Sequence, residues 1–193
     1  MRIGVLGGTF DPIHLGHLAA ARAAMECGRL DKVLLIPTGV PPHRPATVAD
    51  ARQRIEMCRL AIEGEERFEV WDVEVRRRGP SYTVDTLREL RRRYPNDELF
   101  LILGWDAAKL LASWRDPDEV RRLASVVVVT RPGSGAPDAS AGIICQRPTP
   151  DISGSALRRA IAAGDDVSDR LPRRVAEYIA KHRLYGDNRR VGC

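Results

Sequence analysis

Residues Arg2–Ala21 read RIGVLGGTFDPIHLGHLAAA, and the rest of the chain is organised around them. Arg2–Leu6 alternate well enough for a buried first strand, which two glycines then break. Leu15, Leu18 and the alanines that follow begin an apolar helix. The stretch therefore predicts a strand, a tight glycine turn and the start of a helix.

The junction between this strand and this helix is suited to bind an anion. The first N–H groups of a helix carry the positive end of its dipole, and glycine lets an anion approach the backbone closely. His14 and His17 are three residues apart, so a helix that begins near Ile13 turns both imidazoles toward one phosphate. We interpret the junction as a phosphate-binding turn with two histidines.

Other interpretations of the turn are weaker. A glycine turn after a strand is common in proteins without any ligand there. Zinc proteases space their two histidines four residues apart with a Glu between them, and this sequence has neither feature, so no metal site is expected. The dinucleotide fingerprint G-x-G-x-x-G and the Gly-Lys-Ser/Thr of a P-loop are also absent here.

Length and charge narrow the class of protein. A chain of 193 residues suffices for one well-buried domain, and we see no repeat or interdomain linker in it. The net charge of +5 suits phosphorylated substrates. The arginines are dispersed, with few aromatic residues among them, so we expect no nucleic-acid partner. No apolar run approaches the roughly 18 residues of a membrane span, so we expect no membrane contact.

The four cysteines are scattered along the chain, at Cys27, Cys58, Cys145 and Cys193. They show no C-x-x-C spacing, which argues against a disulfide framework and against a cysteine zinc site. The first residues enter a folded element directly, without a long apolar signal region. We therefore expect a cytoplasmic protein with reduced cysteines, and a homo-oligomer stays open.

The remainder of the chain alternates between strand and helix patterns. Short apolar runs predict strands at 32–37, 68–75, 98–103, 125–130 and, at a sheet edge, 143–146. Helical spacing and caps predict one helix that ends near 27 and one over 50–63, and then a helix capped by Ser81 or Thr83. Further helices are predicted over 107–114, from 116, and over 151–164 and 171–182. Gly, Ser, Ala and Pro indicate a flexible loop at 133–142.

Strands separated by helices predict an α/β protein, with a single doubly wound, Rossmann-like parallel sheet and helices on both faces. Such sheets bind ligands beyond the carboxyl ends of their strands, at the switch point in strand order. Polar loops follow four predicted strands directly: the glycine turn, the His43-Arg44 loop, Gly104-Trp105-Asp106 and Arg131-Pro132-Gly133. We expect one domain over residues 1–193, with one site at this edge of the sheet.

The order Gly-x-Phe-x-Pro-x-His-x-Gly-His, at residues 8–17, is identified as the signature of the nucleotidylyltransferase superfamily. The whole chain resembles one of its families, the bacterial nicotinate-nucleotide adenylyltransferases, which make deamido-NAD from ATP and nicotinate mononucleotide. The resemblance rests on further motifs: PPHR at 41–44, SYTVDTL at 81–87, GWDAAKLLASW at 104–114, TRPG at 130–133, ISGSALR at 152–158 and YIAKHRLY at 178–185.

The resemblance implies an ATP site. His14 and His17 would contact the ATP phosphates and stabilise the transition state. Arg158 would grip the β- and γ-phosphates together with Ser153 and Ser155, and the helices from about residue 152 would cover the nucleotide. The remaining ATP-binding residues that it implies are Gly7, Gly8, Thr9 and Phe10 in the turn, with Gly104 and Asp106 at the ribose. We expect Mg²⁺ as cofactor, carried mainly by ATP.

The resemblance also implies a site for nicotinate mononucleotide. Arg44 and Arg131, with His43, would take its phosphate. Trp114 would stack on the pyridine ring, and backbone N–H groups near Thr83 would receive the nicotinate carboxylate.

Two departures from the family pattern affect these sites. Gly154 and Ser155 stand where the family usually has Ser and Thr, which bears on triphosphate affinity. Arg115 follows Trp114 where some members have an aromatic residue, which bears on the pyridine pocket.

Four rival functions stay open. A phosphopantetheine adenylyltransferase typically carries Thr at the position of His14, which counts against that reading. Nicotinamide mononucleotide as the main acceptor is harder to exclude, because it differs from nicotinate mononucleotide only by an amide in place of the carboxylate. The intact pair His14 and His17 argues against a nucleotide-binding regulator, and the dispersed arginines argue against an RNA-binding module.

Overall fold

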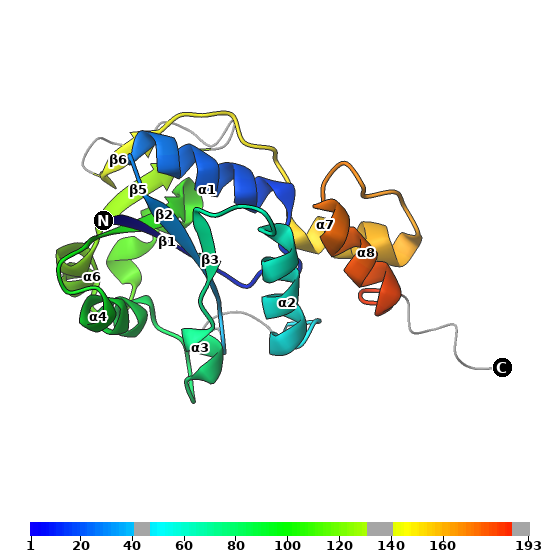
Figure 1. The fold of residues 1–193 in the computed structure, drawn as a ribbon, viewed down its shortest axis with the longest axis horizontal. Helices are drawn as coiled ribbons and strands as arrows, with labels where there is room; N and C mark the ends of the chain where they lie inside the picture. The colour runs from blue at the N-terminus through cyan, green and yellow to red at the C-terminus, as the bar shows by residue number, and fades with distance from the viewer. Residues whose placement is uncertain (41–46, 131–140, 187–193) are drawn as a thin grey trace.

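The structure, a computed structural model, describes residues 1–40, 47–130 and 141–186. Its centre is a parallel sheet of six strands in the order β3-β2-β1-β4-β5-β6 (Figure 1). The strands are β1 (Arg2–Gly8), β2 (Lys32–Pro37), β3 (Phe68–Val70), β4 (Glu98–Gly104), β5 (Ser125–Val129) and β6 (Ile143–Cys145). This is the strand order of the doubly wound dinucleotide-binding fold, so the predicted fold class is confirmed.

Helices connect the strands and cover both faces of the sheet. They are α1 (Leu15–Cys27), α2 (Ala51–Ala61), α3 (Val73–Arg76), α4 (Thr83–Arg93), α5 (Trp105–Lys109), the 3₁₀ helix η1 (Leu111–Ser113), α6 (Pro117–Leu123), α7 (Gly154–Ala163) and α8 (Arg173–Lys181). In Figure 1, α1 lies on one side of the sheet, and α4 and α6 lie on the other.

Alternate strand residues form two separate apolar cores, because neighbouring side chains of a strand point to opposite faces. Leu6, Leu35 and Phe100 pack with residues of α1 and α2 in one core. Val5 and Leu101 pack with residues of α4 and α6 in the other. The helices after β1 and those around β4 therefore lie on opposite faces, which creates the switch point between β1 and β4.

The C-terminal helices join the first of these cores. Leu157 of α7 and Val175 and Ile179 of α8 are buried in it, and α8 packs against α2. In Figure 1, α7 and α8 lie beyond α2, on the side of α2 away from α4 and α6. Over the described ranges, no helix combines the length and apolarity that a bilayer span requires.

Two local predictions around β3 and α4 are wrong. The predicted strand 68–75 ends at Val70, and α3 follows it. Val73 and Glu74 are both buried, whereas a half-buried strand alternates, so the chain must turn there. Helix α4 begins at Thr83, but its N-cap is Tyr82, and no side chain caps it.

The predicted helix 107–114 is also different in the structure. Helix α5 starts two residues earlier and ends at Lys109, and η1 follows. The Ser113 hydroxyl donates to the Leu110 carbonyl at 2.7 Å, a local bond that competes with helix continuation. Trp114 then has extended backbone angles, so it lies outside both helices.

The cysteine prediction needs correction as well. A disulfide joins Cys27, the last residue of α1, to Cys145, the last residue of β6. The two residues are 118 positions apart in sequence, so local spacing could not reveal them. Sheet pairing of β6 beside β5 brings β6 to α1, where the two Cα atoms are 5.8 Å apart.

Candidate active site

The phosphate turn, residues 7–17, lies at the end of β1, at the switch point. β1 ends at Gly8 and its parallel neighbour β4 ends at Gly104, so both glycines lie at the same edge of the sheet. Phe10 has φ of +49°, the left-handed region, which turns the chain sharply. A Cβ on Gly8 would lie 2.9 Å from the Phe10 ring, so this position requires glycine.

His14 and His17 lie together in the structure. His14 is the N-cap of α1 and is 3% exposed. The two imidazole rings stack with centroids 3.6 Å apart. The backbone N–H of His14 donates to Nδ1 of the His17 ring at 3.3 Å. Phe10 contacts His17 edge-on, with ring centroids 5.0 Å apart. A Cβ on Gly16 would lie 3.1 Å from Nδ1 of His14, which explains the second glycine of the motif.

Helix α7 brings the late serine and arginine motif to this turn. Ser153 is its N-cap, and its hydroxyl accepts from the Ala156 N–H at 3.2 Å. Ser155 Oγ lies 3.3 Å from Ser153 Oγ. Arg158 reaches the turn itself, because its Nη1 donates to the Asp11 carbonyl at 2.7 Å. The structure therefore joins residues 153–158 to residues 9–11.

The predicted ribose-binding residues lie where β4 meets α5. Gly104 is the last residue of β4 and the extended N-cap of α5. A Cβ on it would meet nothing within 4 Å. The Asp106 side chain is largely exposed and pairs with Lys109 at 2.9 Å. Its carboxylate is therefore accessible at the same edge of the sheet as the turn.

Thr83 and Trp114, the two predicted pyridine-pocket residues, lie on facing segments. Thr83 is the first residue of α4, and Tyr82 precedes it. The Arg115 guanidinium lies over the Tyr82 ring, with Cζ 4.7 Å from the centroid. Tyr82 precedes Thr83, and Arg115 follows Trp114. This cation–π contact therefore links the segment of Thr83 to the segment of Trp114. The arginine that departs from the family pattern thus has a defined contact.

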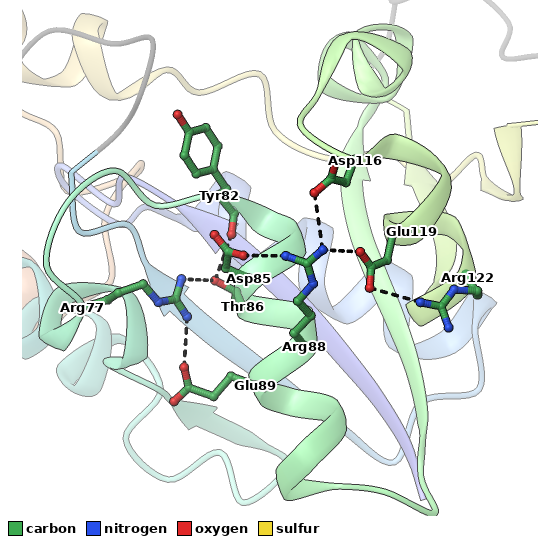
Figure 2. A network of polar contacts seen from close by, with 9 residues as sticks. All are labelled: Arg77, Tyr82, Asp85, Thr86, Arg88, Glu89, Asp116, Glu119 and Arg122. Carbon is green, nitrogen blue, oxygen red and sulfur yellow. Dashed lines mark hydrogen bonds and ion pairs between the residues drawn. The ribbon is translucent and has the colours of Figure 1, made fainter.

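An ion-pair network holds α4 against α6 beside this stack (Figure 2). Arg88 of α4 pairs with Asp85 at 2.9 Å, with Asp116 at 3.4 Å, and with Glu119 of α6. The hydrogen bond from Arg88 lowers the pKa of Glu119, and the same bond raises the pKa of Arg88. Exposed ion pairs add little to stability. Because Asp116 directly follows Arg115, the network links α4 to the segment that carries Trp114 and Arg115.

Behind α4, the carboxyl group of Glu74 is buried and 7% exposed. The Thr86 hydroxyl donates to this carboxyl group at 2.7 Å. Arg77 contacts Thr86 and Glu89 at 3.2 Å and 3.0 Å (Figure 2). Burial raises the pKa of Glu74, while the Thr86 bond and the Arg77 charge oppose that rise. Glu74 therefore keeps a proton in the folded protein to higher pH than in the unfolded chain.

This burial predicts a pH-dependent stability. Between the ordinary pKa of 4.5 and the raised one, the folded state binds the proton more strongly, so the contribution of Glu74 to stability falls as pH rises. Glu74→Gln removes this titration. We expect the melting temperature of the variant, relative to wild type, to increase from pH 5 to pH 8.

The matched control for this prediction is Glu89→Gln, which removes a carboxylate that contacts the same Arg77 from a more exposed position. Its melting temperature should follow the wild-type pH profile. Parallel profiles for wild type and Glu74→Gln would contradict the assignment of a raised pKa to Glu74.

Three predicted mononucleotide-binding residues, His43, Arg44 and Arg131, lie outside the described residues. The segment that leads to the first two is described. Val40 pairs with Pro80 in an isolated parallel bridge, and its carbonyl accepts from the Ser81 N–H at 2.9 Å. The chain after β2 therefore runs beside the entrance to α4.

Four buried or partly buried polar residues were not anticipated from the sequence: Asp11, Arg54, Glu74 and Tyr185. Asp11 stands at an unspecified position of the quoted signature, whereas Tyr185 is the last residue of the YIAKHRLY motif. Arg54 had no signal, because an arginine on a helix is ordinarily solvated. In the structure it is 1% exposed, and burial lowers its pKa.

Comparison with known proteins places the chain in a family. Residues 5–160 match the Cytidylyltransferase-like family model, and the chain belongs to that family. The matched region contains the phosphate turn, β4 and α7 up to Arg158.

Individual relatives are more specific. A "Probable nicotinate-nucleotide adenylyltransferase" of Thermus thermophilus is 46% identical over 96% of this chain and 100% of its own. A protein of the same name from Shouchella clausii is 40% identical over 97% of this chain and 98% of its own. The resemblance to the nicotinate-nucleotide adenylyltransferases is thereby confirmed.

Solved structures agree on the fold. Plasmodium falciparum nicotinic acid mononucleotide adenylyltransferase complexed with NaAD has a TM-score of 0.76, with 18% identity over 95% of this chain and 97% of that one. The same enzyme complexed with APC has a TM-score of 0.75 over 95% and 96% of the two chains.

Proposed function

We propose that this protein transfers the adenylyl group of ATP to nicotinate mononucleotide, which yields deamido-NAD and pyrophosphate. The observation that carries the proposal is the stacked pair of His14 and His17 on the phosphate turn, at the switch point of the sheet. The names of the relatives, which agree across nearly the whole chain, support the choice of substrates.

The proposed reaction needs no covalent intermediate on the protein. A phosphate oxygen of the mononucleotide attacks the α-phosphorus of ATP in line, the bond to the β-phosphate breaks, and pyrophosphate leaves. The protein must hold two anions together and stabilise the charge that develops on the leaving group. The imidazoles of His14 and His17 and the guanidinium of Arg158 donate to those oxygens, and helices α7 and α8 cover the nucleotide.

Magnesium enters this proposal with the nucleotide. No group of three or more His, Cys, Asp or Glu side chains able to hold a metal ion occurs among residues 1–40, 47–130 and 141–186. Mg²⁺ is commonly bound through substrate phosphates and a few waters. We propose that Mg²⁺ would enter bound to the triphosphate and would offset part of its negative charge. The contacts of His14, His17 and Arg158 with the phosphates would be made by the protein itself.

The acceptor pocket is proposed at Thr83, Trp114 and the loop that follows β2. The N–H groups of the first turn of α4 favour a carboxylate, because they carry the positive end of the helix dipole. A neutral amide at the same position gains less from that dipole. The nicotinate form should therefore react faster than the nicotinamide form.

This preference is the first test of the proposal. Pyrophosphate release is measured from ATP and Mg²⁺ with nicotinate mononucleotide, nicotinamide mononucleotide and phosphopantetheine in parallel. We expect kcat/KM to be highest for nicotinate mononucleotide, by roughly 10-fold or more, since one charge-assisted hydrogen bond contributes about 1.5–3 kcal/mol.

The other outcomes have distinct meanings. Equal kcat/KM for the two mononucleotides would contradict the proposed role of the α4 N-terminus. The proposed role of the phosphate turn would be unaffected. Activity with phosphopantetheine alone would show that phosphopantetheine, and not nicotinate mononucleotide, is the acceptor. Binding of ATP without turnover of any acceptor would indicate a nucleotide-binding regulator.

A further inference from the structure

The Asp11 side chain is a buried carboxylate, 6% exposed, inside the phosphate turn. The Val48 N–H donates to its Oδ2 at 2.8 Å, and the Ala49 N–H donates to its Oδ1 at 3.0 Å. The Tyr185 hydroxyl donates to Oδ1 as well, at 2.7 Å. A buried carboxylate is costly unless donors surround it, and these three satisfy it.

Two arginines hold the backbone on either side of Phe10. Arg54 of α2 donates to the Thr9 carbonyl at 2.7 Å, and Arg158 of α7 donates to the Asp11 carbonyl at 2.7 Å. The same Nη1 of Arg158 lies 3.9 Å from the Asp11 carboxylate. The direction of Arg158 therefore depends on where Asp11 is held.

Tyr185 comes from the far end of the chain to complete this cluster. Its ring is 7% exposed, and its hydroxyl lies 4.0 Å from Sδ of Met57 in α2. Its φ is +63°, a left-handed conformation that is costly for an aromatic residue. Such strain persists where the surrounding contacts require it. From this conformation the Tyr185 hydroxyl makes its bond to Asp11.

We propose that Tyr185 is a positioning residue for the reaction: through the Asp11 carboxylate, it holds Arg158 and residues 9–11 in the geometry that receives the ATP phosphates. The inference rests on the proposed function only for the identity of the nucleotide. It assigns to the last motif of the chain a task that neither the phosphate site nor the pyridine pocket explains.

Tyr185→Phe tests this assignment, because it keeps the ring and removes only the hydroxyl. We expect the Kd of a non-hydrolysable ATP analogue, measured by calorimetry, to rise roughly 10-fold, the scale of one lost hydrogen bond to a charged group. The KM for ATP should rise in parallel and the KM for the mononucleotide should not. Tyr178→Phe is the matched control, since Tyr178 is on α8 and packs on His182, away from Asp11.

A double-mutant cycle with Arg158→Ala distinguishes positioning of Arg158 by Tyr185 from a merely structural role of Tyr185. If Tyr185 acts through Arg158, Tyr185→Phe changes the Kd little once Arg158 is absent. Additive effects, or an unchanged Kd in the single variant, would overturn the proposal. Should Tyr185→Phe fail to fold, Asp11→Asn replaces it in the same cycle with the same expectation. The Kd needs no acceptor, so absence of turnover with nicotinate mononucleotide contradicts the proposed function alone.

Discussion

His14→Ala should lower kcat by roughly 10²- to 10³-fold, the loss that follows removal of one preorganised donor to developing negative charge. His14 is buried at the N-cap of α1 and stacks on His17, so its imidazole is held in place before substrate arrives. Preorganisation of this kind contributes to the rate because no reorientation is needed in the transition state. The measurement is steady-state pyrophosphate release at saturating ATP and mononucleotide.

The control for this variant is His182→Ala, which removes an exposed imidazole that packs on Tyr178 far along the chain. We expect its kcat to match wild type. Thermal melts of both variants separate lost folding from lost chemistry. If His14→Ala loses stability but keeps its turnover per folded molecule, His14 is a packing residue and has no part in the mechanism.

Gly39→Ala should have the second large effect, on stability and on the acceptor site together. A Cβ at this position would lie 2.2 Å from the Glu74 carbonyl oxygen and 2.8 Å from its carbon. Both are backbone atoms, so the segment after β2 must move. We expect a loss of about 1–3 kcal/mol in the free energy of unfolding, measured in urea. The KM for nicotinate mononucleotide should rise, because the displaced segment leads to His43 and Arg44.

Gly186→Ala is the matched control for this steric argument. A Cβ there would find its nearest atom, the Arg183 carbonyl oxygen, at 3.7 Å, an ordinary contact. Its free energy of unfolding should stay within about 1 kcal/mol of wild type, the range of the entropic effect of replacing glycine. Equal stability of the two variants would show that the Gly39 segment adapts without cost.

Much of the fold could be predicted because its signals are local. The run from Lys32 to Pro37 is apolar at nearly every position, as a strand covered on both faces must be, and it forms β2 within those bounds. Asp50 begins α2 as predicted, with its side chain accepting from the Gln53 N–H. Patterns of this kind depend on neighbours within a few residues, which the sequence displays directly.

The parts that could not be predicted depend on tertiary contacts. Arg54 looks like any helical arginine until the fold places it against the Thr9 carbonyl. Cys27 and Cys145 become neighbours only through the pairing of β5 with β6. For the site, the residues named from the resemblance stay predictions, although the structure brings Arg158 to the phosphate turn and places Tyr82 beside Arg115.

The bond between Asp11 and Tyr185 also bears on how the protein is made. It spans 174 residues, so Tyr185 leaves the ribosome that many residues after Asp11. At about 5–20 residues per second, the gap is roughly 9–35 s. During that time a nascent chain has the glycines and both histidines but not the finished turn. Competence to hold the nucleotide should therefore appear only after Tyr185 has left the ribosome.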